Sequence, residues 1–255
     1  MSKSDLRIDW ATHEATKYAC ENWHYSRCLP KNKLVKIGAW ERGKFIGVVV
    51  FGYGATPNLG KPYNLTQDRC VELVRIALTK HESSVTRVAA FALKFLRESN
   101  PRLRLVVSYA DPMQGHYGVI YQAGNWIYSG KTQSDVCYRD PSGKLWHRRR
   151  ASRQVTNGKR LVTSDWKTEI QEGKHRYLMP LDAEMRERIL PLAKPYPKRT
   201  KRQAAEHPST LGGSTPTRAL HLPASEAGDG SDQEHGCGAT PTRTLQTSAL
   251  RKVEA

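Results

Sequence analysis

The sequence predicts an α/β fold in which a mixed central sheet is flanked by helices. Strand-like and helical segments alternate through most of the chain, which is the pattern of a layered α/β sheet. Residues 70–108 form the clearest unit, because an apolar strand, an amphipathic helix and a second apolar strand follow one another. From residue 203 onward Gly, Ser, Thr, Pro and Ala dominate and aromatic residues are absent, so we expect a disordered C-terminal tail.

The N-terminal part of the chain is predicted to form one helix and one hairpin. Residues Trp10–Tyr25 have helical character. Lys36–Trp40 and Lys44–Phe51 are predicted strands, joined by the tight turn ERGK as a β-hairpin. Gly52–Leu65 is rich in Gly, Pro and Asn and is predicted to be a loop.

The central β-α-β unit is the most regular part of the sequence. Cys70–Leu78 alternates like a strand, and Val85–Leu96 places its apolar residues on one helical face. Leu103–Ser108 is almost wholly apolar, as expected for a strand covered on both faces. The remaining predicted elements are a short helix at Gly118–Ala123, a strand at Trp126–Ser129, a hairpin around 140–143, a strand at His175–Leu181 and a helix at Asp182–Leu190.

The positive charge is concentrated in one segment. The 255 residues carry 41 Lys and Arg against 24 Asp and Glu, a net charge of +17. Residues 1–143 have a net charge of +8, residues 144–202 have +11, and residues 203–255 have −2. We therefore divide the chain into a folded core (1–143), a basic C-terminal extension of the same domain (144–202) and a low-complexity tail (203–255). The charge excess indicates a polyanionic partner.

Membrane and secreted classes are not expected. The longest apolar run, Ile46–Phe51, is too short to span a membrane, and the first ten residues lack the apolar stretch of a signal peptide. Five cysteines at irregular spacing do not form a disulfide framework and fit a reducing cytosol.

The segment 108–126 contains the first candidate site residues. The apolar strand ends near Asp111, and the following short helix presents Tyr121. Ligands bind beyond the carboxyl ends of strands in open α/β sheets, where a carboxylate can deprotonate a nucleophile and a tyrosine can protonate a leaving group. The structural alternative is that Asp111 begins a turn and Tyr121 packs in the core.

A polar and aromatic cluster at 22–30 is the second candidate. His24 and Tyr25 can bind metal, act in proton transfer or stack on a nucleobase. Cys20, His24 and Cys28 share a helical face if the helix extends that far, although zinc would need a fourth ligand. The alternative is a solvated helix end with ordinary core aromatics.

Two further segments are candidates for phosphate binding. Ser83 and Ser84 precede the helix at 85–96, where free N–H groups favour anions; the alternative is that they are plain N-caps. The segment 144–160 suits phosphate binding with base stacking, unless it is only a solvated face. Its expected nucleic-acid contacts are Arg148, Arg149, Arg150, Arg153, Lys159 and Arg160.

Several motifs together resemble a known family. The strand–helix–strand of 70–108 and the YQAGNW segment resemble the core of GNAT-type acyltransferases. More closely, HYS (24–26), ELVRIAL (72–78), ESS (82–84), VVSYAD (106–111) and GVIYQAGNW (118–126) resemble the phage Mom family. The resemblance spans roughly residues 20–198, and its specificity lies in the combination of motifs. It implies a GNAT-like fold.

The resemblance implies an acyltransferase-like enzyme that modifies adenine N6 in phage DNA with a carbamoylmethyl or methylcarbamoyl-type group, protecting it from host restriction. By resemblance, His24, Tyr25, Asp111 and Tyr121 are the catalytic residues, and Ser84 contacts an acetyl-CoA or related CoA-type donor. Ser83 and Arg75 are further expected contacts of this donor. Iron is also associated with the family, and His24, Tyr25 and Asp111 are its expected ligands. The glycine-rich pyrophosphate loop of GNAT enzymes is absent, which leaves the donor open.

The expected partner is double-stranded DNA with the target adenine flipped out, in the cytoplasm of a bacterial host of a phage or prophage. Two alternatives are open: a GNAT-like N-acetyltransferase acting on a protein or small amine, and a non-catalytic DNA-binding anti-restriction protein. The sequence leaves the oligomeric state undetermined.

Overall fold

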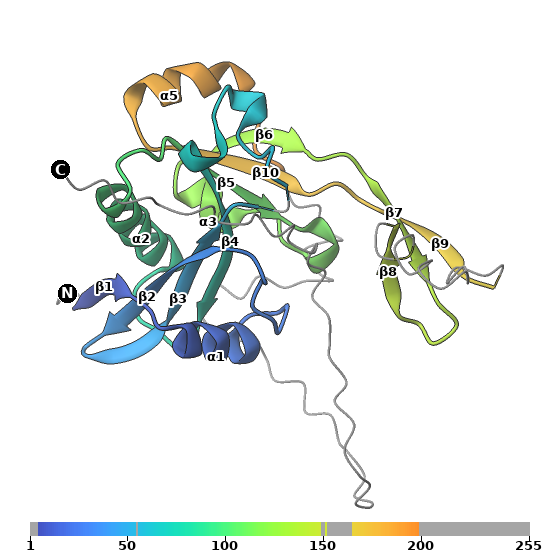
Figure 1. Ribbon diagram of the computed structural model, residues 1–255, viewed down its shortest axis with the longest axis horizontal. Helices are drawn as coiled ribbons and strands as arrows, with labels where there is room; N and C mark the ends of the chain where they lie inside the picture. Colours follow the sequence, from blue (N-terminus) through green and yellow to red (C-terminus); the bar gives the residue numbers. More distant parts are fainter. Residues whose placement is uncertain (1–4, 55, 149–150, 152–164, 199–255) are drawn as a thin grey trace, which may run out of the picture.

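The structure is a computed structural model that describes residues 5–54, 56–148, 151 and 165–198. In these ranges a seven-stranded mixed sheet has the order β1-β2-β3-β4-β5-β10-β6 (Figure 1). The expected mixed α/β sheet flanked by helices is therefore confirmed. The strands of this sheet are β1 (Leu6–Trp10), β2 (Leu34–Glu41), β3 (Lys44–Gly52), β4 (Cys70–Leu78), β5 (Leu105–Ala110), β6 (Ile127–Lys131) and β10 (His175–Pro180).

The centre of the sheet is the predicted β-α-β unit. β4 and β5 are parallel and are connected by α2 (Val85–Ser99), whereas the other strand pairs of this sheet are antiparallel. β10 comes from beyond residue 143 and pairs with both β5 and β6. The sheet is therefore built from both the 1–143 and the 144–202 segments.

The strand alternation of β3 divides the core between the two faces of the sheet. Val49 and Phe51 pack with Val88 and Leu96 of α2, whereas Val48 and Val50 pack with Cys20 of α1 (His13–Trp23). Since successive side chains of a strand point to opposite faces, α1 and α2 cover opposite faces of the sheet. The short helices are α3 (Val119–Ala123) and α5 (Ala183–Ile189), with 3₁₀ turns at Lys61–Tyr63, Gln67–Arg69, Pro112–Gln114 and Leu190–Leu192.

A three-stranded arm projects from the sheet beyond β6 and β10 (Figure 1). It has the order β8-β7-β9, with β7 (Asp135–Arg139), β8 (Leu145–His147) and β9 (Lys167–Gln171). At its base a Cβ on Gly173 would lie 1.8 Å from the carbonyl oxygen of Thr132, so the two connecting segments approach too closely for any other residue. Lys174 lies next to this crossing and donates its backbone N–H to Thr132 Oγ1 at 2.9 Å.

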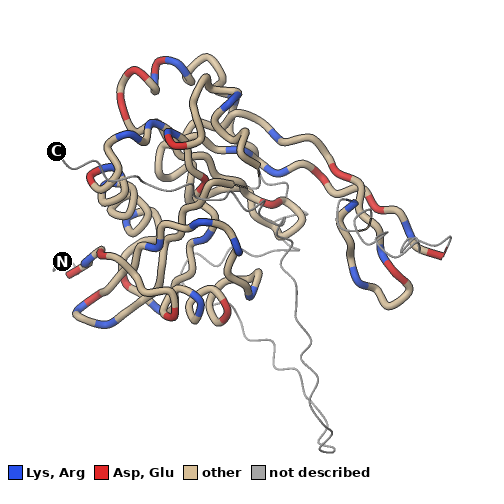
Figure 2. Tube along the Cα trace, viewed as in Figure 1, with Lys and Arg blue, Asp and Glu red and all other residues tan. Residues whose placement is uncertain are grey.

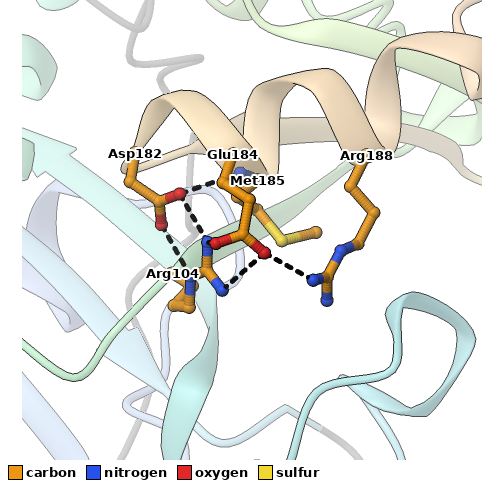
Figure 3. Close-up of polar contacts among 5 residues, drawn as sticks. All are labelled: Arg104, Asp182, Glu184, Met185 and Arg188. Atoms are coloured by element: carbon orange, nitrogen blue, oxygen red, sulfur yellow. Dashed lines mark hydrogen bonds and ion pairs between the residues drawn. The ribbon is translucent and has the colours of Figure 1, made fainter.

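An arginine between two acidic residues attaches α5 to the sheet (Figure 3). Arg104, just before β5, donates to Asp182 Oδ1 and Oδ2 at 2.6 and 2.8 Å and to Glu184 at 2.9 Å. Asp182 also caps α5, because its Oδ1 accepts the N–H of Met185 at 2.8 Å. The Arg104 hydrogen bonds lower the pKa of Asp182.

We expect Asp182→Ala to lower the free energy of unfolding by about 1–3 kcal/mol, because it removes both a helix cap and a charge-assisted, partly exposed contact. Asp182→Asn retains the cap and should lose less. Since the folded pKa of Asp182 is depressed, its contribution is present above the unfolded pKa and is lost as pH falls through the folded pKa. Urea unfolding at pH 7 and pH 3 measures both effects; an equal loss at both pH values would contradict the ionic part.

The structure corrects the N-terminal prediction. Trp10 is not helical but ends β1, where Leu6 and Ile8 pack on the core and Trp10 contacts Phe95 with ring centroids 5.0 Å apart. The helix begins after Thr12, whose hydroxyl accepts the N–H of Ala15 at 3.1 Å. The predicted hairpins at 36–51 and 140–143 and the elements at 70–78, 85–96, 118–123, 175–181 and 182–190 are confirmed within a few residues.

The predicted tail, 203–255, lies outside the described residues. Among the described helices, none has the length and apolar character needed to cross a bilayer.

Candidate active site at the carboxyl ends of β4 and β5

The candidate site lies where the two parallel strands stop pairing. β4 and β5 pair from Cys70–Leu105 to Leu73–Ser108, but β4 continues to Leu78 and β5 to Ala110. Next to this point β4 has a bulge, because Val50 of β3 pairs with Arg75 while Phe51 pairs with Leu73. Bulges redirect side chains, and carboxyl ends of parallel strands form ligand crevices. The backbone groups freed here can face a ligand.

Tyr121 lies on α3 and contacts Ser108 at this point. The Ser108 and Tyr121 hydroxyl oxygens are 2.8 Å apart, and Ser108 Oγ is 3.0 Å from the carbonyl oxygen of Leu73. A serine hydroxyl has one proton, so two hydrogen-bond arrangements are possible. If Ser108 donates to the Leu73 carbonyl, the Tyr121 hydroxyl donates to Ser108. If Ser108 donates to Tyr121 instead, the tyrosine proton is free to donate to a ligand. Burial raises the pKa of Tyr121 to about 12, which keeps it protonated.

His24 and Tyr25 follow the end of α1 and form a row of rings with His116. The ring centroids of His24 and Tyr25 are 4.3 Å apart, and those of Tyr25 and His116 are 5.0 Å apart. Tyr25 is 52% exposed, whereas His24 is buried. Burial, with smaller contributions from Arg75 and His116, lowers the pKa of His24 to about 3. His24 is therefore neutral, and because its Nδ1 accepts the N–H of Ser26 at 3.1 Å, its proton lies on Nε2.

Asp111 follows β5 and is held by two contacts. Its Oδ1 accepts the N–H of Met113 at 3.0 Å, and its Oδ2 lies 3.1 Å from Lys174 Nζ. The backbone N–H of His116 donates to the Asp111 carbonyl at 3.0 Å, which brings the Asp111 turn to the His24–Tyr25–His116 row. The two candidate segments of the sequence, 22–30 and 108–126, thus meet at one site.

Glu72 is a site residue that the sequence interpretation missed. It lies on β4 between Gly52 of β3 and Val107 of β5, and a Cβ on Gly54 would lie 3.0 Å from its Oε2. Burial raises the pKa of Glu72 to about 7, because its effect is larger than the opposing effect of the positive charges of Arg75 and Lys174. A carboxyl group with this pKa is suited to proton transfer at neutral pH. A lone carboxylate in the apolar run CVELVRIAL was the available signal.

The serines before α2 are already engaged. Buried Glu41 accepts the backbone N–H groups of Glu82 and Ser83, both at 2.7 Å, so a carboxylate of the protein occupies the loop where an anion would bind. Ser83 is buried, which does not favour it as a ligand contact. Ser84 is exposed and caps α2 through the N–H of Arg87 at 3.2 Å.

No described contact brings all three expected iron ligands, His24, Tyr25 and Asp111, together as one coordination site. Within the described ranges, no three His, Cys, Asp or Glu side chains come together as a metal site either. The iron ligands therefore stay a prediction, and we derive no step through a metal. Cys28 does not share a helical face with Cys20, because α1 ends at Trp23.

Two cavities, of about 350 and 500 Å³, lie at the other end of β5 and share Arg102 and Leu103 in their walls. Neither is lined by a predicted site residue. Arg102 pairs with Asp68 at 2.7 Å, and Arg104 pairs with Asp182. Two of the arginines that line these cavities are thus paired with carboxylates. Because neither cavity contains a predicted site residue, the candidate active site is the one at the opposite end of the sheet.

Arg148 is the one predicted DNA contact that the structure describes, and it is exposed just after β8. Arg149, Arg150, Arg153, Lys159 and Arg160 lie outside the described residues. On the described arm, basic and acidic residues alternate (Figure 2), and Arg139 pairs with Glu169 at 2.5 Å. Trp146 and Trp166 stack there with centroids 5.7 Å apart.

Comparison with known proteins gives the family. The model of the Mom protein family matches residues 5–198. The chain belongs to the Mom protein family. The methylcarbamoylase Mom of Escherichia phage Mu is 28% identical over 205 residues, which are 76% of this chain and 84% of that protein. The Mom match includes every described residue of the site above.

A solved structure of a candidate acetyltransferase from Acinetobacter baylyi ADP1 aligns with a TM-score of 0.39 and 14% identity, covering 71% of this chain and 95% of that one.

Proposed function

We propose that this Mom protein is an enzyme that transfers a small acyl-type group to N6 of adenine in double-stranded DNA. The observation that carries the proposal is the Mom family match over a chain segment that brings His24, Tyr25, Asp111 and Tyr121 to one end of the sheet. The name of the phage Mu relative supports a methylcarbamoyl-type group, and protection of DNA from restriction is the role we propose for it.

The chemistry requires help, because the N6 lone pair is delocalised into the adenine ring and is a poor nucleophile. In the proposed step a bond forms between N6 and the carbonyl carbon of the donor, and the carbon–sulfur bond of a thioester breaks. Glu72 accepts the proton lost from N6, and Tyr121 gives its proton to the departing thiolate. Orientation of the two reactants supplies much of the rate enhancement.

Three other residues position the reactants in this scheme. Asp111, fixed by Lys174, orients the amine, and the Nε2–H of His24 donates to an acceptor on the base or the carbonyl group. N6 is hydrogen-bonded in duplex DNA, so the adenine must be flipped out. The exposed ring of Tyr25, stacked on His24 and His116, supports a flipped base.

A CoA-type thioester is the proposed donor. The freed backbone after Leu73 and Ser108 and the Tyr121 hydroxyl fit its acyl end. The loop before α2 fits its pyrophosphate less well, because Glu41 occupies the N–H groups of Glu82 and Ser83. Ser84 and Arg75 are therefore retained as the proposed donor contacts.

Nucleoside mass spectrometry of plasmid DNA from cells expressing the protein tests the proposal. A modified deoxyadenosine, together with resistance of the purified DNA to restriction digestion, is the expected result. Finding only unmodified deoxyadenosine while folded protein is present would contradict the proposal. Protection that is lost when the protein is removed would instead indicate a non-catalytic DNA-binding protein.

The basic segment gives a separate prediction. Replacing Arg148, Arg149 and Arg150 with Ala should reduce the slope of log K for DNA binding against log salt concentration by about 2–3, since each phosphate contact contributes about 0.9. The matched control replaces the exposed residues Arg7 of β1, Arg42 between β2 and β3 and Lys94 of α2, which removes the same charge outside the arm. Equal slopes for the two triple variants, from fluorescence anisotropy over 50–300 mM salt, would exclude a specific role.

A further inference from the structure

Arg75 is a cation at the site to which the proposed function assigns a donor contact but no step of proton transfer. The bulge in β4 sets it opposite Val50, on the face covered by α1. Its charge contributes to the low pKa of His24 and opposes the raised pKa of Glu72, so it lies within electrostatic reach of both.

The guanidinium of Arg75 is fixed on one side and has only a weak sulfur contact on the other. Nη1 donates to the carbonyl oxygen of Val74 at 2.7 Å. Nε is buried and has no hydrogen-bond partner among the described residues. Nη2 has Cys28 Sγ at 4.0 Å, which is a weak acceptor. No described Asp or Glu forms an ion pair with Arg75.

This arrangement leaves without an oxygen acceptor, among the described residues, the edge that recognises an oxyanion. Nε and Nη2 are two parallel donors that match the two oxygens of a carboxylate or phosphate. A buried guanidinium with an unpaired N–H is costly, and sites retain such a group where a ligand supplies the missing acceptor. Arg176 shows the contrast, because its Nε donates to Ser129 Oγ at 3.1 Å.

The surroundings favour a carboxylate over a phosphate. Glu72 and Asp111 already place negative charge at the site, which disfavours a dianionic group more than a monoanionic one. The geometry points to Arg75 as the binding site for a carboxylate on a small ligand, held by Nε and Nη2 beside Glu72. Within the proposed function, on which only this last step rests, that ligand binds beside the thioester donor, because the methylcarbamoyl-type group proposed for transfer carries no carboxylate.

Direct binding tests the inference without DNA. Ligand-observed NMR at constant ionic strength would measure acetate and malonate as carboxylate probes and inorganic phosphate as the competing probe. The variants are Arg75→Gln and Arg75→Lys, with Arg176→Gln as the matched control. We expect carboxylate affinity to fall by about tenfold or more in Arg75→Gln, by less in Arg75→Lys, and to be unchanged in Arg176→Gln.

Thermal unfolding shows whether a loss of carboxylate binding in an Arg75 variant comes from loss of the binding group or from loss of the fold. Arg75→Gln removes a half-buried charge that has no ion-pair partner among the described residues, so it should unfold at the same or a higher temperature than the natural protein. Acetate should raise the melting temperature only where Arg75 is present. Equal carboxylate affinity in Arg75→Gln, or binding of phosphate alone, would overturn the inference. Since DNA is absent, Arg75-dependent carboxylate binding without adenine modification would overturn the proposed function and leave the carboxylate site standing.

Discussion

Glu72→Gln is expected to reduce the rate of adenine modification by about 100-fold or more while leaving the protein folded. General bases contribute on the order of 10²–10⁴ in rate, and Gln has the shape of Glu without its basicity. Single-turnover formation of the modified nucleoside measures the effect. An Asp111→Ala variant that loses more activity than Glu72→Gln would transfer the role of base to Asp111. Glu98→Gln, an exposed carboxylate on α2, is the control and should be fully active.

The same residue predicts the pH dependence of the reaction. Glu72 must be ionised to accept a proton, and its pKa is about 7, so activity should rise with pH through this value and then level off. Glu72→Gln should lack this dependence in its residual activity. A wild-type profile that is flat from pH 5.5 to pH 8.5 would contradict the assignment.

As pH rises through the pKa of Glu72, the free energy of unfolding should fall while activity rises. Because burial raises the pKa of Glu72 in the folded state, the folded protein binds more protons than the unfolded chain near pH 6. The contribution of Glu72 to folding stability is fully present below its unfolded pKa of about 4.5 and is lost as pH rises through its folded pKa of about 7. Glu72→Gln should therefore be more stable than the natural protein at pH 8, with a smaller difference at pH 4. Lost activity with gained stability separates a catalytic residue from a structural one.

The sequence was informative about the fold where periodicity was long. The β-α-β unit from Cys70 to Ser108 was predictable, since an apolar helix face and two apolar strands define it without tertiary information. The segment at Trp10 was not, because LRIDW alternates over only five residues and continues into a helix. β9 was also missed, since its residues Lys167–Gln171 are mostly polar and derive their strand structure from pairing with β7.

The site was predictable in part for a related reason. Asp111 and Tyr121 lie next to a strand end, and strand ends are visible in a sequence. Glu72 lies inside a strand, and its altered pKa depends on neighbours from β3, the loop after it and the arm base. The bulge that places Arg75 requires the register of β3 against β4, which no local pattern encodes.

Tyr121→Phe should lower the single-turnover rate by about 100-fold, because it removes the proton for the leaving group and keeps the ring. The ring packs against Trp126 and Tyr177, with centroids 5.0 and 5.1 Å away, and Phe preserves these contacts. The loss of one hydrogen bond should cost only about 1 kcal/mol of stability. Tyr128→Phe, which removes a buried hydroxyl 3.0 Å from His175 Nδ1, is the matched control and should retain activity.

Ser108→Ala distinguishes a proton donor from a structural hydroxyl. If Tyr121 acts as the acid, Ser108 only stabilises its two hydrogen-bonded states, so Ser108→Ala should cost about tenfold while Tyr121→Phe costs far more. If the Tyr121 hydroxyl serves only to tie α3 to β5 through Ser108, both variants break the same contact and should lose activity equally. The pKa of Tyr121, about 12, adds a constraint: the rate should not decline with rising pH before the protein itself loses structure. Equal losses in the two variants, or a falling limb near pH 9, would therefore remove Tyr121 from the proton transfer and leave the thiolate to be protonated by water.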